Sequence, residues 1–260
     1  MKLFDAHCHL QDLRIFPQVK IAVDSANKNN IKYIAVKSTT EEDWSRVEEL
    51  NNRFDIINPS FGLHPWFLAL RSENWQSKLK KYLFQYPNAG VGEIGIDPDT
   101  KGDSGVDIEE QEIIFYHQLK IAKEFQRPVS IHCRSAWGRL LKILKDIGEL
   151  PGGLMIHCYG GSIETAKELL KIGAYISFSG TITRLNNKKA ADVIKNIPSD
   201  KILLETDAPD LLPYGIRSEI NEPANLIHVL NKASEFRKQS VTLLAEQTFI
   251  NTCRFFNIVN

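Results

Sequence analysis

The feature that most restricts the possible folds of this chain is a regular alternation of two kinds of segment. Short runs rich in Val, Ile, Leu and Ala are typical of buried parallel strands, and longer segments with apolar residues three and four positions apart are typical of amphipathic helices. The strand-like runs are 2–7, 32–37, 56–63, 89–94, 128–132, 153–157, 174–178 and 201–205. The helix-like segments are 17–29, 41–53, 75–85, 108–125, 137–147, 163–171, 188–196, 223–234 and 240–256.

Local signals mark several helix ends within this series. Thr39 and Glu42 have the spacing of a capping box, in which two side chains satisfy backbone N–H groups of the first helical turn. Asp107 and Glu110 have the same spacing. Gly173 stands where a glycine commonly ends a helix. These positions agree with the division into alternating elements.

Eight strand-and-helix units predict a closed barrel, because apolar parallel strands must be covered by helices. An open doubly wound sheet usually has fewer units and often carries a Gly-rich turn after its first strand, where this chain has His7-Cys8-His9. The 260 residues contain no linker or repeat, and single barrels of about 250 residues are common. We therefore expect an α/β chain that forms one TIM-type (β/α)8 barrel domain over 1–260, with extra C-terminal helices.

The charge balance limits the partners of the protein. Lysine plus arginine equals aspartate plus glutamate, at 32 residues each, so no global positive field holds the chain on nucleic acid or on an anionic membrane. No apolar run approaches the roughly 20 residues of a membrane span, and the first residues lack the apolar region of a signal peptide. We expect a cytoplasmic protein with no membrane association and no obligate protein partner, which grips any polyanion locally.

The four cysteines show neither a CxxC spacing nor a disulfide framework. Cys8, Cys133 and Cys158 each follow a histidine directly. Because neighbouring side chains of a strand point to opposite faces, we expect these cysteines to pack under helices on the outer face of the strands, and not to bind a metal.

Residues with metal-binding chemistry recur at the carboxyl ends of the expected strands, which meet at one face of a parallel barrel. Five of the seven histidines lie at such ends, and the other two, His117 and His228, lie in helix-like segments, where we interpret them as surface or packing residues. The strand-end residues are His7, His9, His64, Glu93, His132, His157 and Asp207.

Four of these histidines and two carboxylates exceed what one tetrahedral ion needs, whereas two ions that share a carboxylate fit the number of ligands. Two cations about 3.5 to 4 Å apart can activate water and clamp both oxygens of a phosphoester. No nucleophile elbow or Walker loop competes for the role. We predict two divalent ions, Zn, Ni, Fe, Mn or Mg. The predicted ligands are His7, His9, Asp207 and Glu93 for one ion, and His132, His157 and Glu93 for the other.

These residues belong to short motifs that follow one another through nearly the whole chain. The motifs are Asp-Ala-His-Cys-His at 5–9, Gly-Leu-His-Pro at 62–65, Gly-Glu-Ile-Gly-Ile-Asp at 92–97, Pro-Val-Ser-Ile-His-Cys-Arg at 128–134, Ile-His-Cys-Tyr-Gly-Gly at 156–161, Glu-Thr-Asp-Ala-Pro at 205–209 and Asn-Glu-Pro at 221–223. The series resembles the TatD family of metal-dependent deoxyribonucleases. The resemblance implies a TIM barrel, divalent metals, hydrolysis of DNA and the same six ligands.

Two segments depart from the family pattern. The family usually has an aromatic pair after the motif at 92–97, where this chain has Pro98 and Asp99 followed by 100–103. It commonly has a tyrosine where this chain has Asp210. Both departures lie in loops over the expected metals, so we expect them to affect the choice of substrate more than metal binding.

The resemblance and the strand-end positions suggest further roles. By hypothesis, His64 contacts a phosphate oxygen or protonates the leaving group, while Glu93 bridges the ions and Asp207 also accepts the proton of water. Glu205 is a candidate hydrogen-bond partner for a ligand histidine.

Substrate contacts are assigned with alternatives left open. Arg134 and Arg217 either pair with phosphate or close structural ion pairs. Tyr159 and Trp66 either stack on bases or pack within a lid.

The sequence therefore favours a deoxyribonuclease that uses two metal ions. An amidohydrolase or esterase that acts on a small molecule at the same metals is the alternative. A catalytically silent barrel that serves as a scaffold is a third possibility, whose signature would be a lost ligand, and none of the six is missing.

Overall fold

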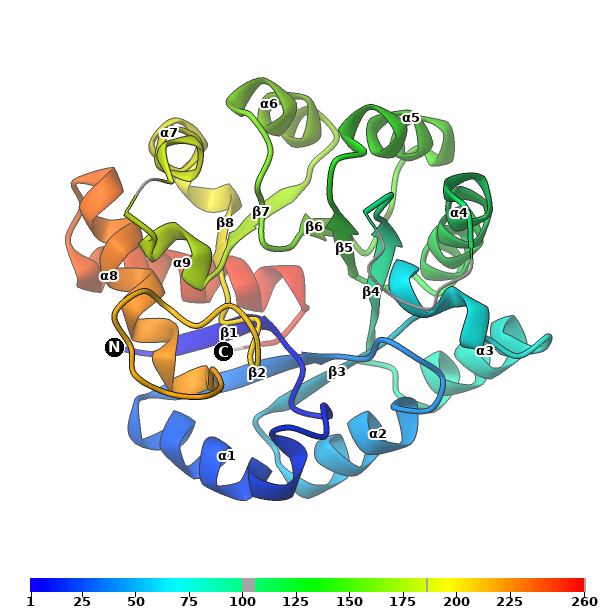
Figure 1. Cartoon of the computed structure of the whole chain (residues 1–260), viewed down its shortest axis with the longest axis horizontal. Helices are drawn as coiled ribbons and strands as arrows, with labels where there is room; N and C mark the ends of the chain where they lie inside the picture. The colour runs from blue at the N-terminus through cyan, green and yellow to red at the C-terminus, as the bar shows by residue number, and fades with distance from the viewer. Residues whose placement is uncertain (100–105, 186, 260) are drawn as a thin grey trace.

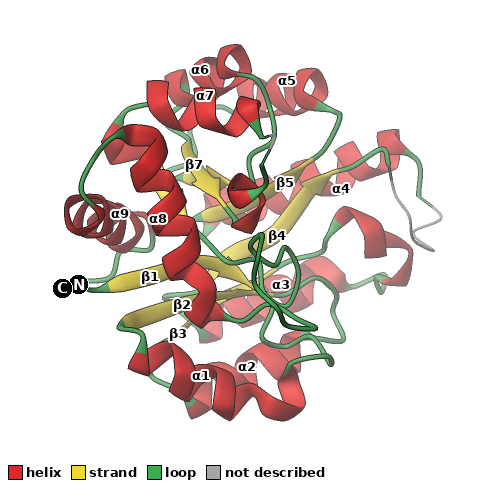
Figure 2. Cartoon of the chain, turned by 60° about the vertical axis from the view of Figure 1, so that its left-hand side comes forward, coloured by secondary structure: helices red, strands yellow, loops and turns green. Residues whose placement is uncertain are grey.

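The computed structural model describes residues 1–99, 106–185 and 187–259. Within these residues, eight parallel strands lie in the order β1 to β8, each paired with its neighbours in the sequence. Helices surround the strands on the outside (Figures 1 and 2). The last strand returns to the first, where the Asp207 backbone N–H donates to the His7 carbonyl oxygen at 2.9 Å. The predicted TIM-type barrel is confirmed.

The observed elements follow the predicted alternation closely. The strands are β1 Leu3–Cys8, β2 Ile31–Lys37, β3 Ile57–Phe61, β4 Gly90–Ile96, β5 Val129–Cys133, β6 Leu154–Ile156, β7 Tyr175–Phe178 and β8 Ile202–Leu204. The α-helices are α1 Val19–Lys28, α2 Trp44–Arg53, α3 Trp75–Gln85, α4 Ile108–Glu124, α5 Trp137–Ile147, α6 Ile163–Lys171, α7 Lys188–Asn196, α8 Leu226–Arg237 and α9 Val241–Phe255. Short 3-10 helices are η1 Phe16–Gln18, η2 Pro65–Leu70, η3 Gly180–Thr183, η4 Ser199–Lys201 and η5 Pro223–Asn225.

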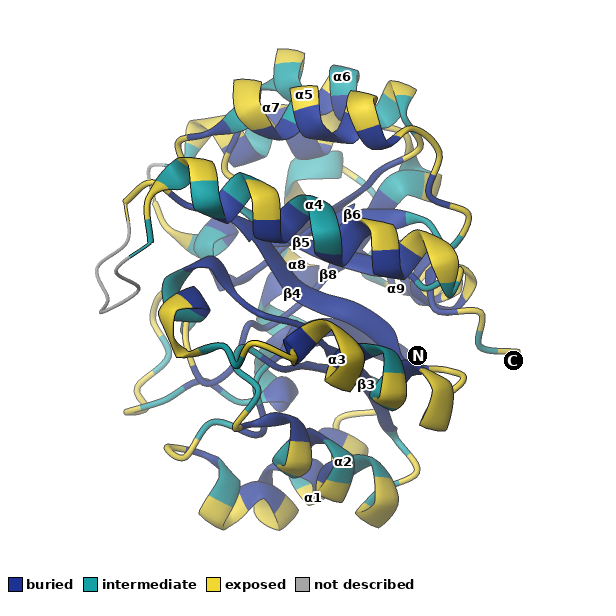
Figure 3. Cartoon of the chain, turned by 90° about the vertical axis from the view of Figure 1, so that its right-hand side faces the viewer, coloured by how far each residue is buried: buried dark blue, intermediate teal, exposed yellow. Residues whose placement is uncertain are grey.

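The core has two layers, because strand side chains alternate between the helices and the barrel interior. Outward-facing residues such as Ile34 and Val36 pack with the buried faces of the helices. Inward-facing residues such as Ala35, Met155 and Leu203 form a second cluster, which also contains Phe256 just after α9. Most strand residues are buried, whereas the helices expose their outer faces (Figure 3). This apolar cluster fills one end of the barrel interior, and polar side chains gather at the other end.

None of the helices in the described part of the chain combines the length and the apolar character that a membrane crossing needs.

Two of the three predicted helix-end signals are confirmed. The Asp107 carboxylate accepts from the Glu110 backbone N–H at 2.8 Å at the start of α4, which is one half of the predicted capping box, whereas the Glu110 carboxylate accepts from Arg71. Gly173 has φ of +84°, a left-handed conformation that glycine adopts readily after a helix.

The predicted capping box of Thr39 and Glu42 is wrong. Helix α2 begins two residues later than Glu42, at Trp44, and Asp43 is the side chain that organises this turn. The Asp43 carboxylate accepts from the backbone N–H of Thr39 at 2.9 Å and from its hydroxyl at 2.8 Å. The Glu42 side chain is 83% exposed and lies 3.8 Å from the Arg46 guanidinium group, so it takes no part in a capping box.

This turn gives a stability prediction. Replacing the buried Asp43 by alanine leaves the Thr39 N–H and hydroxyl without their acceptor, so Asp43→Ala should lower the free energy of unfolding by about 2 kcal/mol. The matched control Glu42→Ala should change it by less than about 0.5 kcal/mol. Urea unfolding followed by circular dichroism measures both, and equal losses would contradict the assignment of Asp43.

Candidate metal centre

The strand-end residues that the sequence singled out lie together at the carboxyl-terminal mouth of the barrel. The packing of β4 against β5 is close there, because a Cβ on Gly95 would overlap the His132 carbonyl oxygen. Gly95 has φ of +153°, so glycine is required on both counts. This close approach brings Glu93, on β4, beside His132, on β5.

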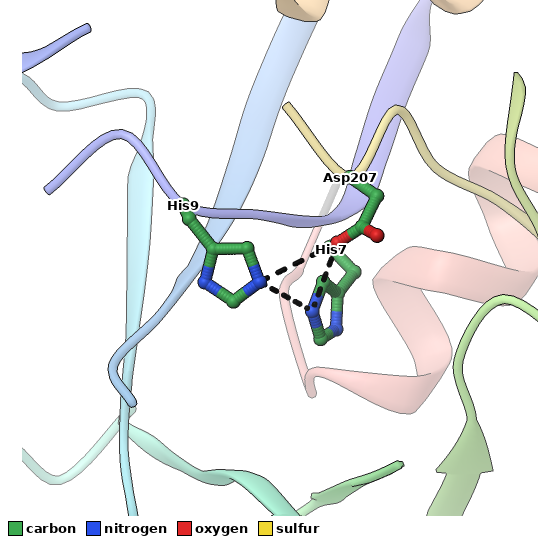
Figure 4. Close-up of side chains that lie close together, drawn as sticks. All are labelled: His7, His9 and Asp207. Atoms are coloured by element: carbon green, nitrogen blue, oxygen red, sulfur yellow. Dashed lines mark hydrogen bonds and ion pairs between the residues drawn. The ribbon is translucent and has the colours of Figure 1, made fainter. Parts of the chain in front are cut away.

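One group of donor atoms comes from the first and last strands. The Nε2 atoms of His7 and His9 lie 3.2 Å apart. The Asp207 Oδ1 atom lies 3.6 Å from the first and 3.4 Å from the second. Figure 4 shows these three side chains directed at one point. The Glu93 Oε2 atom completes the group, at 3.4 Å from His7 and 3.2 Å from His9.

A second group forms around the other oxygen of the same carboxylate. The Glu93 Oε1 atom lies 2.7 Å from His157 Nε2 and 2.9 Å from His132 Nδ1. These two nitrogens lie 3.0 Å apart. Glu93 thus directs one oxygen to each pair of histidines.

The first group fits a tetrahedral metal ion. Ligand atoms 2.0 to 2.1 Å from such an ion are about 3.3 Å from one another, and the five measured separations run from 3.2 to 3.6 Å. Asp207 Oδ1 is also buried without a hydrogen-bond partner among the described residues, which is costly unless a cation satisfies it. The chemistry of the donors, imidazole and carboxylate, suits a divalent transition metal.

Buried acceptors fix the orientation of His9 and His132. The His9 Nδ1 atom lies 2.8 Å from the Lys37 carbonyl oxygen, and the His132 Nε2 atom lies 3.0 Å from Asp97 Oδ2. An acceptor at one ring nitrogen places the proton there, so the lone pair of the other nitrogen faces the centre.

His7 and His157 are held in a similar way. The His7 Nδ1 atom lies 2.9 Å from the Ser130 hydroxyl. The His157 Nδ1 atom lies 3.4 Å from Glu205 Oε1, an ion-pair distance longer than a normal hydrogen bond. Glu205 itself is fixed by the Ser177 hydroxyl at 2.5 Å and by the Cys158 backbone N–H at 2.6 Å. Each of the four histidines therefore has a polar group behind it.

His64 is oriented in the opposite sense. Its Nδ1 atom accepts the Trp66 backbone N–H at 3.2 Å, so the proton of the neutral ring sits on Nε2. That nitrogen points to Glu93 Oε1 at 3.3 Å. Burial lowers the pKa of His64 to about 4, so the ring is neutral at neutral pH. His64 presents a donor to the centre, whereas the other four histidines present lone pairs.

The electrostatics of the centre depend on Glu93. Burial alone would raise the pKa of this carboxyl, but the surrounding histidines, His157 foremost, hold its pKa well below the usual range. Burial also keeps the pKa of His7 well below its usual value. Burial lowers the pKa of His9, His132 and His157, but the neighbouring carboxylates outweigh burial and raise the pKa of all three rings. A cation that binds beside the ionised Glu93 carboxylate therefore takes the place of a proton on these rings.

The donor groups form the floor of an open cavity of about 1010 Å³. Arg134 lies on its wall, with Nε 3.6 Å from the Asp99 carboxylate. Trp66 also lines the cavity, and its Nε1 donates to Asp97 at 2.8 Å. The structure therefore places these two predicted substrate contacts at the cavity.

Arg217 and Tyr159 do not line the cavity among the described residues. Arg217 is exposed in the segment after β8. Tyr159 is 3% exposed, donates its hydroxyl to the Ser162 carbonyl oxygen at 2.7 Å and packs against Trp137. Its ring is thus part of the protein core, and base stacking by Tyr159 is not compatible with this arrangement.

The prediction for the cysteines is correct only in part. Cys8 is fully buried in the layer between strands and helices, as expected. Cys133 packs against the same layer, as expected, and also borders the cavity. Cys158 instead lies on the cavity wall, with its sulfur 3.1 Å from the Ser179 hydroxyl. The strict alternation of a strand does not reach Cys158, because β6 ends at Ile156 and Cys158 has φ of +41°.

The carboxylates at both departures from the family pattern, Asp210 and Asp99, accept hydrogen bonds from nearby groups. Arg14 donates to both oxygens of Asp210, at 2.9 and 2.8 Å, and also to Asp12. Asp99 accepts from the Ser135 hydroxyl at 3.0 Å. The segment 100–103 lies outside the described residues.

Three groups that hold the histidines were not predicted from the sequence, namely Asp97, Ser130 and the Lys37 carbonyl group. Ser130 precedes His132 by two positions on one strand, a spacing that places both on the same face and could have indicated it. Asp97 lies in the quoted motif at 92–97 but beyond the end of β4. A backbone carbonyl gives no sequence signal at all.

Comparisons with known proteins agree with this geometry. The sequence model of the family described as "TatD related DNase" matches residues 4–257. The uncharacterized metal-dependent hydrolase YabD of Bacillus subtilis is 32% identical over 257 residues, which cover 98% of this chain and 99% of the relative. The crystal structure of YjjV, a TatD homologue from Escherichia coli, has a TM-score of 0.92 and 30% identity, with 99% of this chain and 98% of that chain covered.

The acceptor behind His132 gives a test of the centre. Asp97→Asn removes the charge that holds the Nε2–H, so the affinity for metal should fall about 10- to 100-fold while the fold is retained. The matched control Asp99→Asn makes the same change two residues away, at a carboxylate that contacts no histidine. Competition with a chromogenic chelator measures the affinity, and equal affinities of the two variants would remove the role of Asp97.

Proposed function

Because the chain belongs to the TatD-related DNase family of metal-dependent hydrolases, we propose that it is a deoxyribonuclease that hydrolyses phosphodiester bonds with two divalent metal ions. The observation that carries the proposal is the position of Glu93, whose two oxygens face two separate groups of donors. The description of the family supports DNA as the substrate, and the cavity is open enough for a strand end.

In this proposal each donor group holds one ion. Divalent ions bound there would polarise a phosphoryl oxygen and supply an activated water at neutral pH. The residues that hold the first ion are His7, His9, Asp207 and Glu93, and those that hold the second are His132, His157 and Glu93.

Two side chains of the centre have further roles in the proposed reaction. Asp207 is the base that accepts the proton of the attacking water, since its carboxylate lies at the edge of the first donor group. His64 donates a hydrogen bond from Nε2 to a phosphoryl oxygen. The ring of His64 is neutral at neutral pH and carries one proton, on Nε2, so it has no imidazolium proton to give to a leaving group, and we favour the first of the two roles predicted for His64.

An amidohydrolase or esterase that uses the same metals is the second candidate. The specific observation in its favour is that the cavity has little uncompensated positive charge. Arg14 and Arg134 on its wall lie beside carboxylates, and a small neutral substrate needs no further cations.

The nuclease assay separates these candidates. We expect the protein loaded with Mn²⁺, Zn²⁺ or Mg²⁺ to cleave labelled single-stranded DNA, and EDTA to abolish the cleavage. Glu93→Gln keeps the shape but leaves one donor oxygen, so bound metal should fall by about half or more and cleavage at least about 1000-fold. Glu42→Gln, at the exposed rim, is the control.

The outcome that would refute the nuclease is equally specific. Hydrolysis of an amide or ester panel without cleavage of DNA would leave the second candidate. A Glu93→Gln variant with full metal content and full activity would refute the bridge.

His64 gives a separate prediction. His64→Ala should lower kcat about 100- to 1000-fold, which is the usual effect when an enzyme loses one hydrogen-bond donor to the charge that develops in the transition state. The metal content should stay unchanged. His64→Gln, which keeps an N–H donor, should restore part of the activity. Elemental analysis of both variants distinguishes this role from ligation, because loss of metal from His64→Ala would make His64 a ligand.

A further inference from the structure

The wall of the cavity differs in character around the barrel mouth. After β3, the helix η2 presents three apolar or aromatic side chains to the cavity, namely Trp66, Phe67 and Leu70. Leu70 is 66% exposed, so this part of the wall is accessible from solvent. An accessible wall of this kind favours a flat apolar group such as a nucleobase.

The cations of the wall are of two kinds. Arg14 is held by Asp12 and Asp210 in ion pairs of 2.8 Å each. Arg46 donates to the Gln11 carbonyl oxygen at 3.0 Å and lies 3.8 Å from Glu42. These two guanidinium groups are occupied by groups of the protein itself.

Arg134 and Lys189 are the remaining cations of the wall among the described residues. Arg134 lies 3.6 Å from Asp99. Lys189 is exposed and has no hydrogen bond or ion pair within the described ranges. Lys189 is therefore the wall cation whose charge is not compensated by a protein carboxylate.

The barrel places these two features opposite each other. Strand β3, which precedes η2, and strand β7, which precedes α7 and Lys189, are four strands apart in a barrel of eight. Figure 1 shows β3 and β7 on opposite sides of the barrel. The donor groups come from the strands between them on both sides, so a molecule that reaches from η2 to Lys189 crosses the centre.

We infer that the cavity binds a nucleotide in one orientation. A base lies against the wall formed by Trp66, Phe67 and Leu70, and the reacting phosphodiester lies over the donor groups. A second phosphate lies at Lys189. This inference rests on the proposed function and names a subsite of the same cavity. The volume of about 1010 Å³ is at the upper end of small-molecule sites, which is room for a dinucleotide. Lys189 is thus a specificity-determining residue for a terminal or flanking phosphate.

The test compares dinucleotides with and without a terminal phosphate, in both 5′ and 3′ forms. The wild-type protein should show a lower KM for one phosphorylated form. Lys189→Ala should raise that KM about tenfold, the effect of one charge-assisted hydrogen bond, without changing the KM of the unphosphorylated form. Lys189→Arg should retain the preference.

Two further variants act as controls. Lys188→Ala removes an adjacent exposed lysine that does not line the cavity, and should leave both values unchanged. Leu70→Ser should raise KM for all dinucleotides alike and leave the ratio between them intact.

Three results would overturn the inference. Equal behaviour of Lys189→Ala and Lys188→Ala would remove the subsite. If only Leu70→Ser changes the ratio of KM between the phosphorylated and unphosphorylated dinucleotides, the second phosphate lies on the η2 side. If the wild-type protein cleaves no phosphodiester at all, the proposed function fails and the subsite fails with it, whereas the first two results leave the nuclease in place.

Discussion

The centre of this protein depends on the polar groups that lie behind its histidines. A neutral imidazole offers a lone pair on one nitrogen only, so a ligand histidine must have its proton fixed on the other. The Lys37 carbonyl group, at the end of β2, does this for His9, and the Asp97 carboxylate, just after β4, does it for His132. Without such acceptors the rings would be free to turn, and the donor atoms would no longer converge.

A polar layer of this kind is stable only because the rest of the interior is apolar and closed. Below the centre, the inward-facing side chains of several strands meet Phe256 just after α9. Lys37 lies where the apolar and polar parts of the interior meet. Its amino group lies 4.3 Å from the Phe256 ring and donates to the Ser60 hydroxyl. Burial lowers the pKa of this lysine to about 7. The Lys37 amino group thus lies between a polar hydroxyl and the apolar cluster.

The wall and the floor of the cavity are built from different parts of the chain. The floor is made of residues within or just after strands, and their positions are set by the sheet. The wall is made of the loops and helices that follow the strands, and in the loops a change is tolerated if its charge is compensated, as Arg14 compensates Asp210. Under the proposed function, the wall would select the substrate and the floor would hold the metal ions.

The sequence by itself determined the barrel and the floor of its site. Periodicity placed the strands to within a few residues, and the ends of parallel strands must meet, so His7, Glu93 and His157 were found without coordinates. Tertiary structure decided the rest. Which ring nitrogen faces inward, that Tyr159 is in the core, and that Lys189 faces the cavity all depend on contacts between residues far apart in the chain. Periodicity reports only which face of its own element a residue occupies, and carries no information on these contacts.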